Sequence, residues 1–303
     1  MTHSPATPAE PPARPRRRGA LIDTPTVPRR WTPPPPPVAA WRTLRCRLAA
    51  RGLPLTRNER VIAGLKGAHR GERCFILGNG PSLNACDLTR LKNETTFGVN
   101  SIFLNRDPMG FDPTYYVVED VLVAEDRAEA IDAYRGPRCK FFGHYLRRFL
   151  AGDDATCWLN VLVDYADYDG FPRFSPDASR RLWVGGTVSY LCLQLAYHMG
   201  FAEVYLVGFD HAYTIPETVE RDGRRLTSTA SDPNHFHGDY FGKGYRWHDP
   251  QVERMEVAYR RAKAAFEADG RKVFNATAGG KLEVFDRVAY DALFPPRIQE
   301  QAA

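Results

Sequence analysis

A short apolar run followed at once by a glycine turn constrains the fold of this chain more than any other stretch. Cys74 to Leu77 has the length of a buried strand, and the run stops at Gly78-Asn79-Gly80-Pro81. The two glycines allow backbone angles that other residues resist, and Pro81 cannot continue a strand. Such a turn presents N–H groups at the carboxyl end of a strand, where open α/β sheets bind ligands, phosphate above all. A plain strand-to-helix turn without a ligand is the alternative.

Strand and helix patterns alternate along the chain after this turn. Short apolar runs predict strands at 96–100, 115–118, 139–142, 204–207 and 273–275, and helical spacing predicts helices at 85–91, 121–134, 188–199 and from 249 onward. This rhythm predicts an α/β, Rossmann-like domain over residues 71–295, with a mainly parallel sheet and flanking helices. The aromatic, irregular stretch 143–183 is expected to be an inserted lid region over the carboxyl edge of the sheet, or else a packed loop.

The first seventy residues differ from the rest in composition. Residues 1–37 are rich in proline and carry six arginines, which predicts a disordered tail that could make weak contact with an anionic membrane surface. Residues 38–70 are expected to form a helical arm, in which Trp41, Leu44 and Leu48 make one apolar stripe and Thr56 to Glu59 fits a capping box. This arm either packs on the main domain or mediates a homo-oligomer. No stretch resembles a nucleic-acid-binding module.

Composition and cysteine usage indicate the compartment. No run of about 18 apolar residues occurs, so no spanning helix is expected, and the first residues lack the apolar segment of a secretory signal. The six cysteines are scattered without a C-x-x-C pair, and several lie in apolar runs. These features predict a cytoplasmic protein, with peripheral contact at the inner membrane as an option, and no structural zinc.

Polar residues stand at the ends of the predicted strands. They are Gly78-Asn79-Gly80, Asn100, Glu119-Asp120, Asp210 and Asn275. In a parallel sheet these ends share one edge, where α/β proteins build their sites. The first turn is neither a P-loop, which needs a lysine, nor a dinucleotide fingerprint, whose third glycine is replaced by Leu83. Its amides can still hold a nucleotide phosphate, as can Thr187 and Ser189 at a predicted helix start, whose alternative role is capping.

The histidines after Asp210 are candidates for acid–base chemistry. His248 precedes Asp249-Pro250, a predicted helix start whose positive end disfavours imidazolium and keeps the ring neutral, as a general base requires. A surface or capping residue is the alternative. His237 is the second candidate catalytic residue, and with His235 it forms an H-x-H that ligates metal only if a third ligand is near. Asp167-Tyr168-Asp169 is a D-x-D, a pattern with which many sugar-nucleotide transferases hold a divalent metal.

From Arg73 to about Phe285 the chain resembles the MptE-like, or DUF115, proteins and the bacterial sialyltransferases of glycosyltransferase family 42. The shared landmarks are Gly78-Asn79-Gly80-Pro81-Ser82-Leu83, Asn100, Thr187 and Ser189 at a helix start, Gly208-Phe209-Asp210, and a histidine before the penultimate helix. The first string is fairly specific, and the others are specific only jointly. The long loop 234–247 and the proline-rich tail depart from the pattern of the sialyltransferases.

The sialyltransferase resemblance implies an inverting, metal-independent glycosyltransferase that uses a nucleotide sugar, most simply a CMP-linked acidic sugar. It would act in surface polysaccharide or glycoconjugate synthesis on a glycan or lipid-linked acceptor. His248 falls where that family keeps its catalytic base. The nucleotide-binding residues would be Gly78, Asn79, Gly80, Ser82, Asn100, Thr187, Ser189, Asp210, Tyr213 and Asn275.

The MptE-like resemblance implies a different reaction, which is pyrophosphate transfer from ATP to 6-hydroxymethylpterin. That reaction requires magnesium, and Asp120 and Asp210 would be its candidate ligands. A non-catalytic nucleotide-binding module is the third hypothesis.

Overall fold

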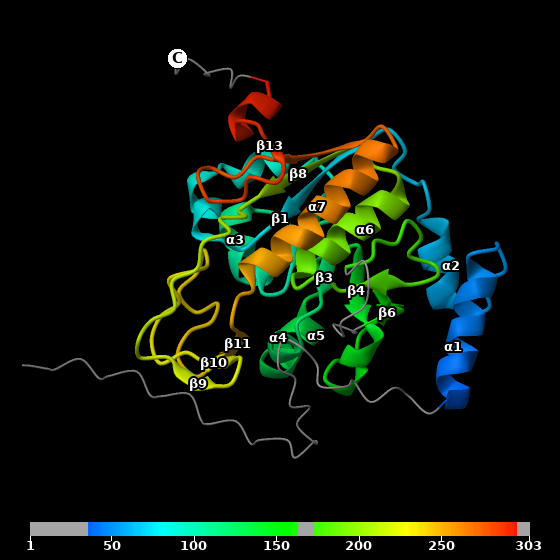
Figure 1. Cartoon of the computed structure of the whole chain (residues 1–303), viewed down its shortest axis with the longest axis horizontal. Helices are drawn as coiled ribbons and strands as arrows, with labels where there is room; N and C mark the ends of the chain where they lie inside the picture. Colours follow the sequence, from blue (N-terminus) through cyan, green and yellow to red (C-terminus); the bar gives the residue numbers. More distant parts are fainter. Residues whose placement is uncertain (1–35, 163–171, 296–303) are drawn as a thin grey trace, which may run out of the picture.

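The computed structural model describes residues 36–162 and 172–295, and these form one layered α/β body around a large sheet (Figure 1). The sheet has eight strands in the order β13-β12-β8-β1-β2-β3-β4-β5, and every pairing in it is parallel. The strands are β1 (Arg73–Leu77), β2 (Thr96–Val99), β3 (Tyr115–Val118), β4 (Cys139–Gly143), β5 (Thr156–Leu159), β8 (Glu203–Val207), β12 (Lys272–Asn275) and β13 (Asp286–Arg287). The predicted Rossmann-like fold with a mainly parallel sheet is therefore confirmed.

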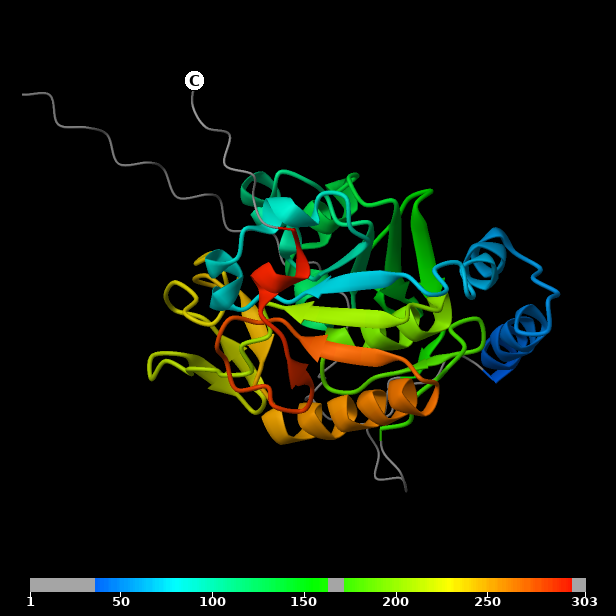
Figure 2. The same ribbon diagram turned by 90° about the horizontal axis from the view of Figure 1, so that it is seen from above.

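Strand β1 lies at the centre of the sheet, between β2 and β8. Its residues Cys74 to Leu77 are fully buried because helices and turns cover both faces, as is usual for parallel sheets. Helices α6 (Val188–Met199) and α7 (Val252–Ala268) lie side by side on one face. The opposite face carries the 3₁₀ turns Pro81–Ala85 and Leu88–Leu91, which replace the short helix expected at 85–91 (Figure 2).

Two helices differ from their predicted limits. The expected helix 121–134 is divided into α4 (Val121–Asp126) and α5 (Ala128–Ala133), because Arg127 between them has φ −121° and ψ 21°. At this break the Arg127 guanidinium donates to the carbonyls of Asp239 and Tyr240 in a distant loop.

Helix α7 begins at Val252, with Gln251 as its N-cap, instead of at the predicted Asp249-Pro250. The carboxylate of Asp249 is paired with Arg221 (2.6 Å), and its N–H donates to the carbonyl of Arg224 (2.8 Å). Asp249 therefore extends the preceding strand pairing and does not cap the helix.

The helical arm consists of α1 (Pro36–Ala49) and α2 (Arg57–Gly64), and the predicted capping box at Thr56 and Glu59 is present. The arm packs on the main domain through Asn58. Its side chain donates to the carbonyl of Trp158 (3.0 Å) and accepts from the Trp158 N–H (2.6 Å), so it imitates a neighbouring strand at the outer edge of β5. The tail 1–35 lies outside the described residues.

Two inserted segments complete the fold. Segment 143–183 supplies β5 and the pair β6 (Val161–Leu162) and β7 (Leu182–Trp183), and the D-x-D at 167–169 falls outside the described residues. Segment 211–250 supplies an antiparallel sheet of β9 (Glu220–Asp222), β10 (Arg225–Thr227) and β11 (Arg246–His248). This small sheet lies beyond the carboxyl ends of the central strands.

All six cysteines are free thiols. Over the described ranges, no helix combines the length and apolar character needed to cross a membrane.

Candidate functional site

A cavity of about 230 Å³ opens at the carboxyl edge of the sheet, between the ends of β1 and β8. From β1 the strands continue through β2 to β5 on one side, whereas β8 and β12 are added on the other. A crevice forms at such a switch point because the two connections leave in opposite directions. Most of the predicted site residues line this cavity, which brings together Gly78, Asn79, Gly80, Asn100, Thr187, Asp210, Tyr213 and His248.

The glycine turn after β1 is locked against the turn after β8. The N–H groups of Gly78 and Gly80 donate to the carbonyls of Val207 (2.7 Å) and Gly208 (2.9 Å). A Cβ atom at Gly78 would lie 2.4 Å from the carbonyl oxygen of Gly208, and one at Gly80 would lie 1.9 Å from a carboxylate oxygen of Asp210. The glycines are therefore required for close approach of the two turns. Their two amides serve the protein, and the phosphate-binding role expected for them is not available in this arrangement.

Asp210 also holds the turn after β1 against the turn after β8. Its Oδ2 accepts hydrogen bonds from the hydroxyl (2.6 Å) and the N–H (3.3 Å) of Ser82. Ser82 does not line the cavity, so the structure places it behind the turn, where it orients Asp210.

Two asparagines of the cavity lining have unsatisfied acceptors. Asn79 is 9% exposed, and its Nδ2 donates to the Val99 carbonyl (3.2 Å) and the Tyr240 hydroxyl (2.8 Å). Asn100 has φ 48°, a left-handed conformation that is uncommon outside glycine. The Oδ1 atoms of both are buried and accept no hydrogen bond from the described residues. A buried acceptor without a donor costs about 1–3 kcal/mol, so a ligand that donates here would recover that free energy.

His248 is held by a carboxylate on the cavity wall. Its Nδ1 lies 3.2 Å from Oδ2 of Asp120, whose Oδ1 accepts from the N–H groups of Leu122 (2.7 Å) and Val123 (3.3 Å) at the start of α4. Burial opposes ionisation of Asp120, but the charge of His248 and these hydrogen bonds outweigh it and lower the pKa of Asp120.

The predicted reason for a neutral His248 was the positive end of the following helix. Because α7 begins at Val252 and His248 closes β11, the group that acts on the ring is instead the Asp120 carboxylate, which attracts positive charge.

Glu119, the neighbour of Asp120, also lines the cavity and titrates in the opposite sense. Burial and the adjacent Asp120 charge raise its pKa to about 7, although His248 partly offsets them. Adjacent carboxyl groups with opposite shifts are typical of sites that transfer protons.

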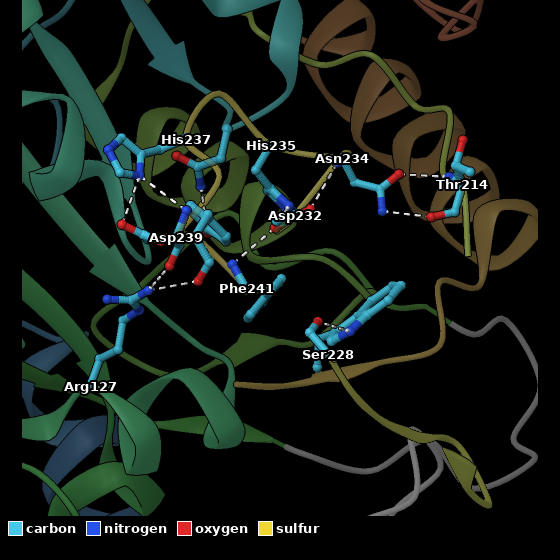
Figure 3. A network of polar contacts seen from close by, with 12 residues as sticks. Arg127, Thr214, Ser228, Asp232, Asn234, His235, His237, Asp239 and Phe241 are labelled. Atoms are coloured by element: carbon cyan, nitrogen blue, oxygen red, sulfur yellow. Dashed lines mark hydrogen bonds and ion pairs between the residues drawn. The ribbon is translucent and has the colours of Figure 1, made fainter. Parts of the chain in front are cut away.

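His235 is a cavity residue that the sequence indicated only as half of an H-x-H metal-binding option. Its Nδ1 lies 2.7 Å from Asp232 (Figure 3). Its ring stacks on Tyr240 with centroids 4.0 Å apart. The D-x-x-H spacing of Asp232 and His235 was the available signal. His237, which the sequence reasoning selected as catalytic, lies outside the cavity and its side chain is half-exposed. Its Nδ1 accepts from the Asp239 N–H (3.1 Å), so it shapes the loop.

Two more predicted residues support the walls from behind. Ser189 is fully buried, and its hydroxyl hydrogen-bonds to those of Thr187 (2.8 Å) and Tyr259 (2.8 Å). Asn275 is also fully buried, and its Nδ2 donates to the Leu282 carbonyl (2.8 Å). Neither side chain lines the cavity, whose walls include aromatic rings that the motifs did not single out: Phe209, Tyr240, Phe241, Trp247 and Tyr259.

The magnesium site implied by the MptE-like resemblance was compared with the residues present. Within residues 36–162 and 172–295, no group of three or more His, Cys, Asp or Glu side chains is placed to hold a metal ion. Both oxygens of Asp120 already face protein donors, and Oδ2 of Asp210 accepts from Ser82. These residues do not fit a metal site made by the protein.

Comparisons with known proteins give two findings. A family model described as 6-hydroxymethylpterin diphosphokinase MptE-like matches residues 54–216. Among solved structures, the chain is similar to the MAf glycosyltransferase from Magnetospirillum magneticum AMB-1, with a TM-score of 0.45 and 14% sequence identity. That match covers 82% of this chain and 38% of the other, so this chain spans well under half the length of that protein. No curated protein matches the sequence.

Proposed function

This chain belongs to the MptE-like family, whose model covers over half of it, and on that premise we propose that it is a transferase that deprotonates an acceptor hydroxyl for attack on a nucleotide-linked donor. The observation that carries the proposal is the Asp120–His248 pair on the wall of a cavity at the switch point of the sheet. A carboxylate that holds Nδ1 of a histidine fixes the ring and stabilises the imidazolium that forms when the ring takes a proton.

The reaction that we favour is inverting glycosyl transfer. The acceptor hydroxyl gives its proton to His248 as its oxygen attacks the anomeric carbon of the donor sugar. The bond between that carbon and the phosphate oxygen breaks, and the nucleotide leaves with the electron pair. The Asp120–His248 pair supports this chemistry because it offers a positioned base.

The donor that we propose is a nucleotide sugar, with a CMP-linked acidic sugar as the leading candidate. The buried Oδ1 atoms of Asn79 and Asn100 need donors, and the exocyclic amino group of cytosine is one. The ring of Tyr213, which is 39% exposed and lines the cavity, offers a stacking surface for a base. The acceptor would be a glycan or a lipid-linked sugar of surface polysaccharide or glycoconjugate synthesis, and the setting would be cytoplasmic.

Pyrophosphate transfer from ATP to 6-hydroxymethylpterin is the second candidate, because the matching family model carries that description. The acceptor hydroxyl of the pterin would also need a base, so His248 would keep its role. A thermal-shift panel of CMP, CTP, UDP, ATP with magnesium, and 6-hydroxymethylpterin separates the two. Stabilisation by CMP and CTP without magnesium supports glycosyl transfer, whereas stabilisation by ATP only with magnesium and pterin supports the diphosphokinase. If no ligand raises the melting temperature, both proposals fail in favour of a non-catalytic module.

The test of the base is the variant His248→Ala, with His237→Ala as the matched control outside the cavity. We expect His248→Ala to lose turnover by about 10²-fold or more while it keeps nucleotide binding, because it removes the proton acceptor and leaves the other walls in place. His237→Ala should keep both. Turnover that is equal in the two variants would remove the base assignment.

A further inference from the structure

The helical arm carries an apolar face that nothing in the described structure covers. Five large hydrophobic side chains of segment 38–55 are about half exposed or more, whereas only three others are exposed in the rest of the described chain. The five are Val38 (54%), Trp41 (53%), Leu44 (47%), Leu53 (60%) and Leu55 (50%), and we call them the arm face. Two of the three residues of the predicted stripe, Trp41 and Leu44, are therefore left out of the packing, whereas Leu48 is partly buried. Helix α1 is instead buried through Cys46 and Ala49.

Positive charge surrounds the arm face. Arg47 and Arg51 are exposed, and Arg47 follows Leu44 by three residues, which places it on the same side of α1. Helix α1 contains no acidic residue. The first sixty residues hold twelve arginines and three acidic residues, so they carry a net charge of +9, whereas the remainder of this +5 chain carries −4. The basic charge is thus concentrated in the part of the sequence that contains the arm face.

We propose that the arm face docks on an anionic lipid surface. Exposed leucines beside a tryptophan, flanked by arginines, fit a bilayer boundary, where apolar side chains enter the acyl region and guanidinium groups pair with lipid phosphates. The arm lies at the opposite end of the molecule from β9–β11, as both views show. Strand β11 supplies Trp247 and His248 to the cavity wall, so docking of the arm leaves the cavity open. The proposal stands independently of the reaction proposed above.

A second copy of the chain fits the arm face less well. Two-fold pairing through α1 would bring together two basic segments that each expose Arg47 and Arg51 and have no acidic residue in α1, and like charges at an interface are unfavourable. A stable protein interface also buries about 1,200 Å² or more, which is large for one helix of 14 residues and the loop after it. Lipid phosphate meets the same arginines with opposite charge.

The test is co-sedimentation of the full chain with vesicles of phosphatidylcholine, with and without phosphatidylglycerol. We expect the chain to bind only the anionic vesicles, and to bind them more weakly when salt is added. We expect the double variant Trp41→Ser, Leu44→Ser to bind these vesicles more weakly by about tenfold or more. That variant keeps every arginine. Val257→Ser is the matched control, because Val257 is 42% exposed on α7 and lies off the arm. All three residues are exposed, and thermal melting checks that each variant folds.

Three results would overturn the proposal. The chain fails to sediment with anionic vesicles, or sediments equally with neutral ones. The double variant binds as tightly as the wild type, which would assign binding to the arginines of the tail alone. Light scattering without lipid shows a dimer that the double variant loses, which would identify a second copy as the partner.

Discussion

Glu119 gives the most quantitative prediction, because its environment sets how stability depends on pH. Burial and the neighbouring Asp120 raise the pKa of Glu119 from 4.5 to about 7. Ionising this carboxyl group in the folded protein therefore costs about 3 kcal/mol more than in the unfolded chain, at ~1.4 kcal/mol per pH unit. The folded state holds the proton more tightly, so this contribution to stability is complete below pH 4.5 and is lost as the pH rises to about 7.

The variant Glu119→Gln keeps the neutral shape and removes the titration. Its stability relative to the wild type should grow by about 2.5 kcal/mol between about pH 5 and about pH 8, because only the wild type pays for the buried charge at high pH. For a chain of this size that corresponds to about 5–10 °C in melting temperature, as an upper value for a partly accessible group.

The assay is thermal melting of both proteins across that pH range. Glu217→Gln, which removes a charge from an exposed glutamate of the 211–250 segment, controls for the change in net charge. A Glu119→Gln difference that is the same at both ends of the range would refute the assigned burial cost. A difference that grows toward low pH would reverse its sign.

Three other substitutions test the contact between the turns after β1 and β8, the orientation of His248, and the packing of the helical arm on β5. Gly78→Ala should lose about 2 kcal/mol or more of stability in chemical denaturation, because its Cβ would meet a backbone carbonyl at 2.4 Å, whereas Gly64→Ala, with open space around it, should not. Asp120→Asn should lower turnover while nucleotide binding persists, because it removes the charge that orients His248; unchanged turnover would count against the pair. Asn58→Ala should speed hydrogen exchange in β5 and cost about 1–3 kcal/mol, and an unaltered exchange rate would contradict the edge-capping role.

The sequence predicted the sheet well because its strands are local apolar runs that end in turn residues. Cys74 to Leu77 and Val204 to Val207 each carry their own signal, and both are buried strands. The parallel sheet then brings their ends together, which is why Asn79, Asn100 and Asp210 line one cavity. These inferences need only residue type, spacing and the geometry of a parallel sheet.

The remaining features depend on contacts between distant segments. The start of α7 shifted because Asp249 is paired with Arg221, and no local pattern reveals that partner. The amides of Gly78 and Gly80 look available for phosphate in the sequence, but they donate to carbonyls at the end of β8 and in the turn after it. His235 and His237 are alike in sequence, and only the fold of the loop turns one ring into the cavity and the other outward.

The central claim is that this edge of the sheet binds a nucleotide, and calorimetric titration of CMP tests it most directly. The account predicts that the wild type and His237→Ala bind with equal affinity. It also predicts that Asn79→Ala, checked for folding by its melting curve, binds more weakly by about 1–3 kcal/mol, because the buried Oδ1 acceptor is gone. Absence of CMP binding in the wild type, or equal affinity in Asn79→Ala, would contradict it.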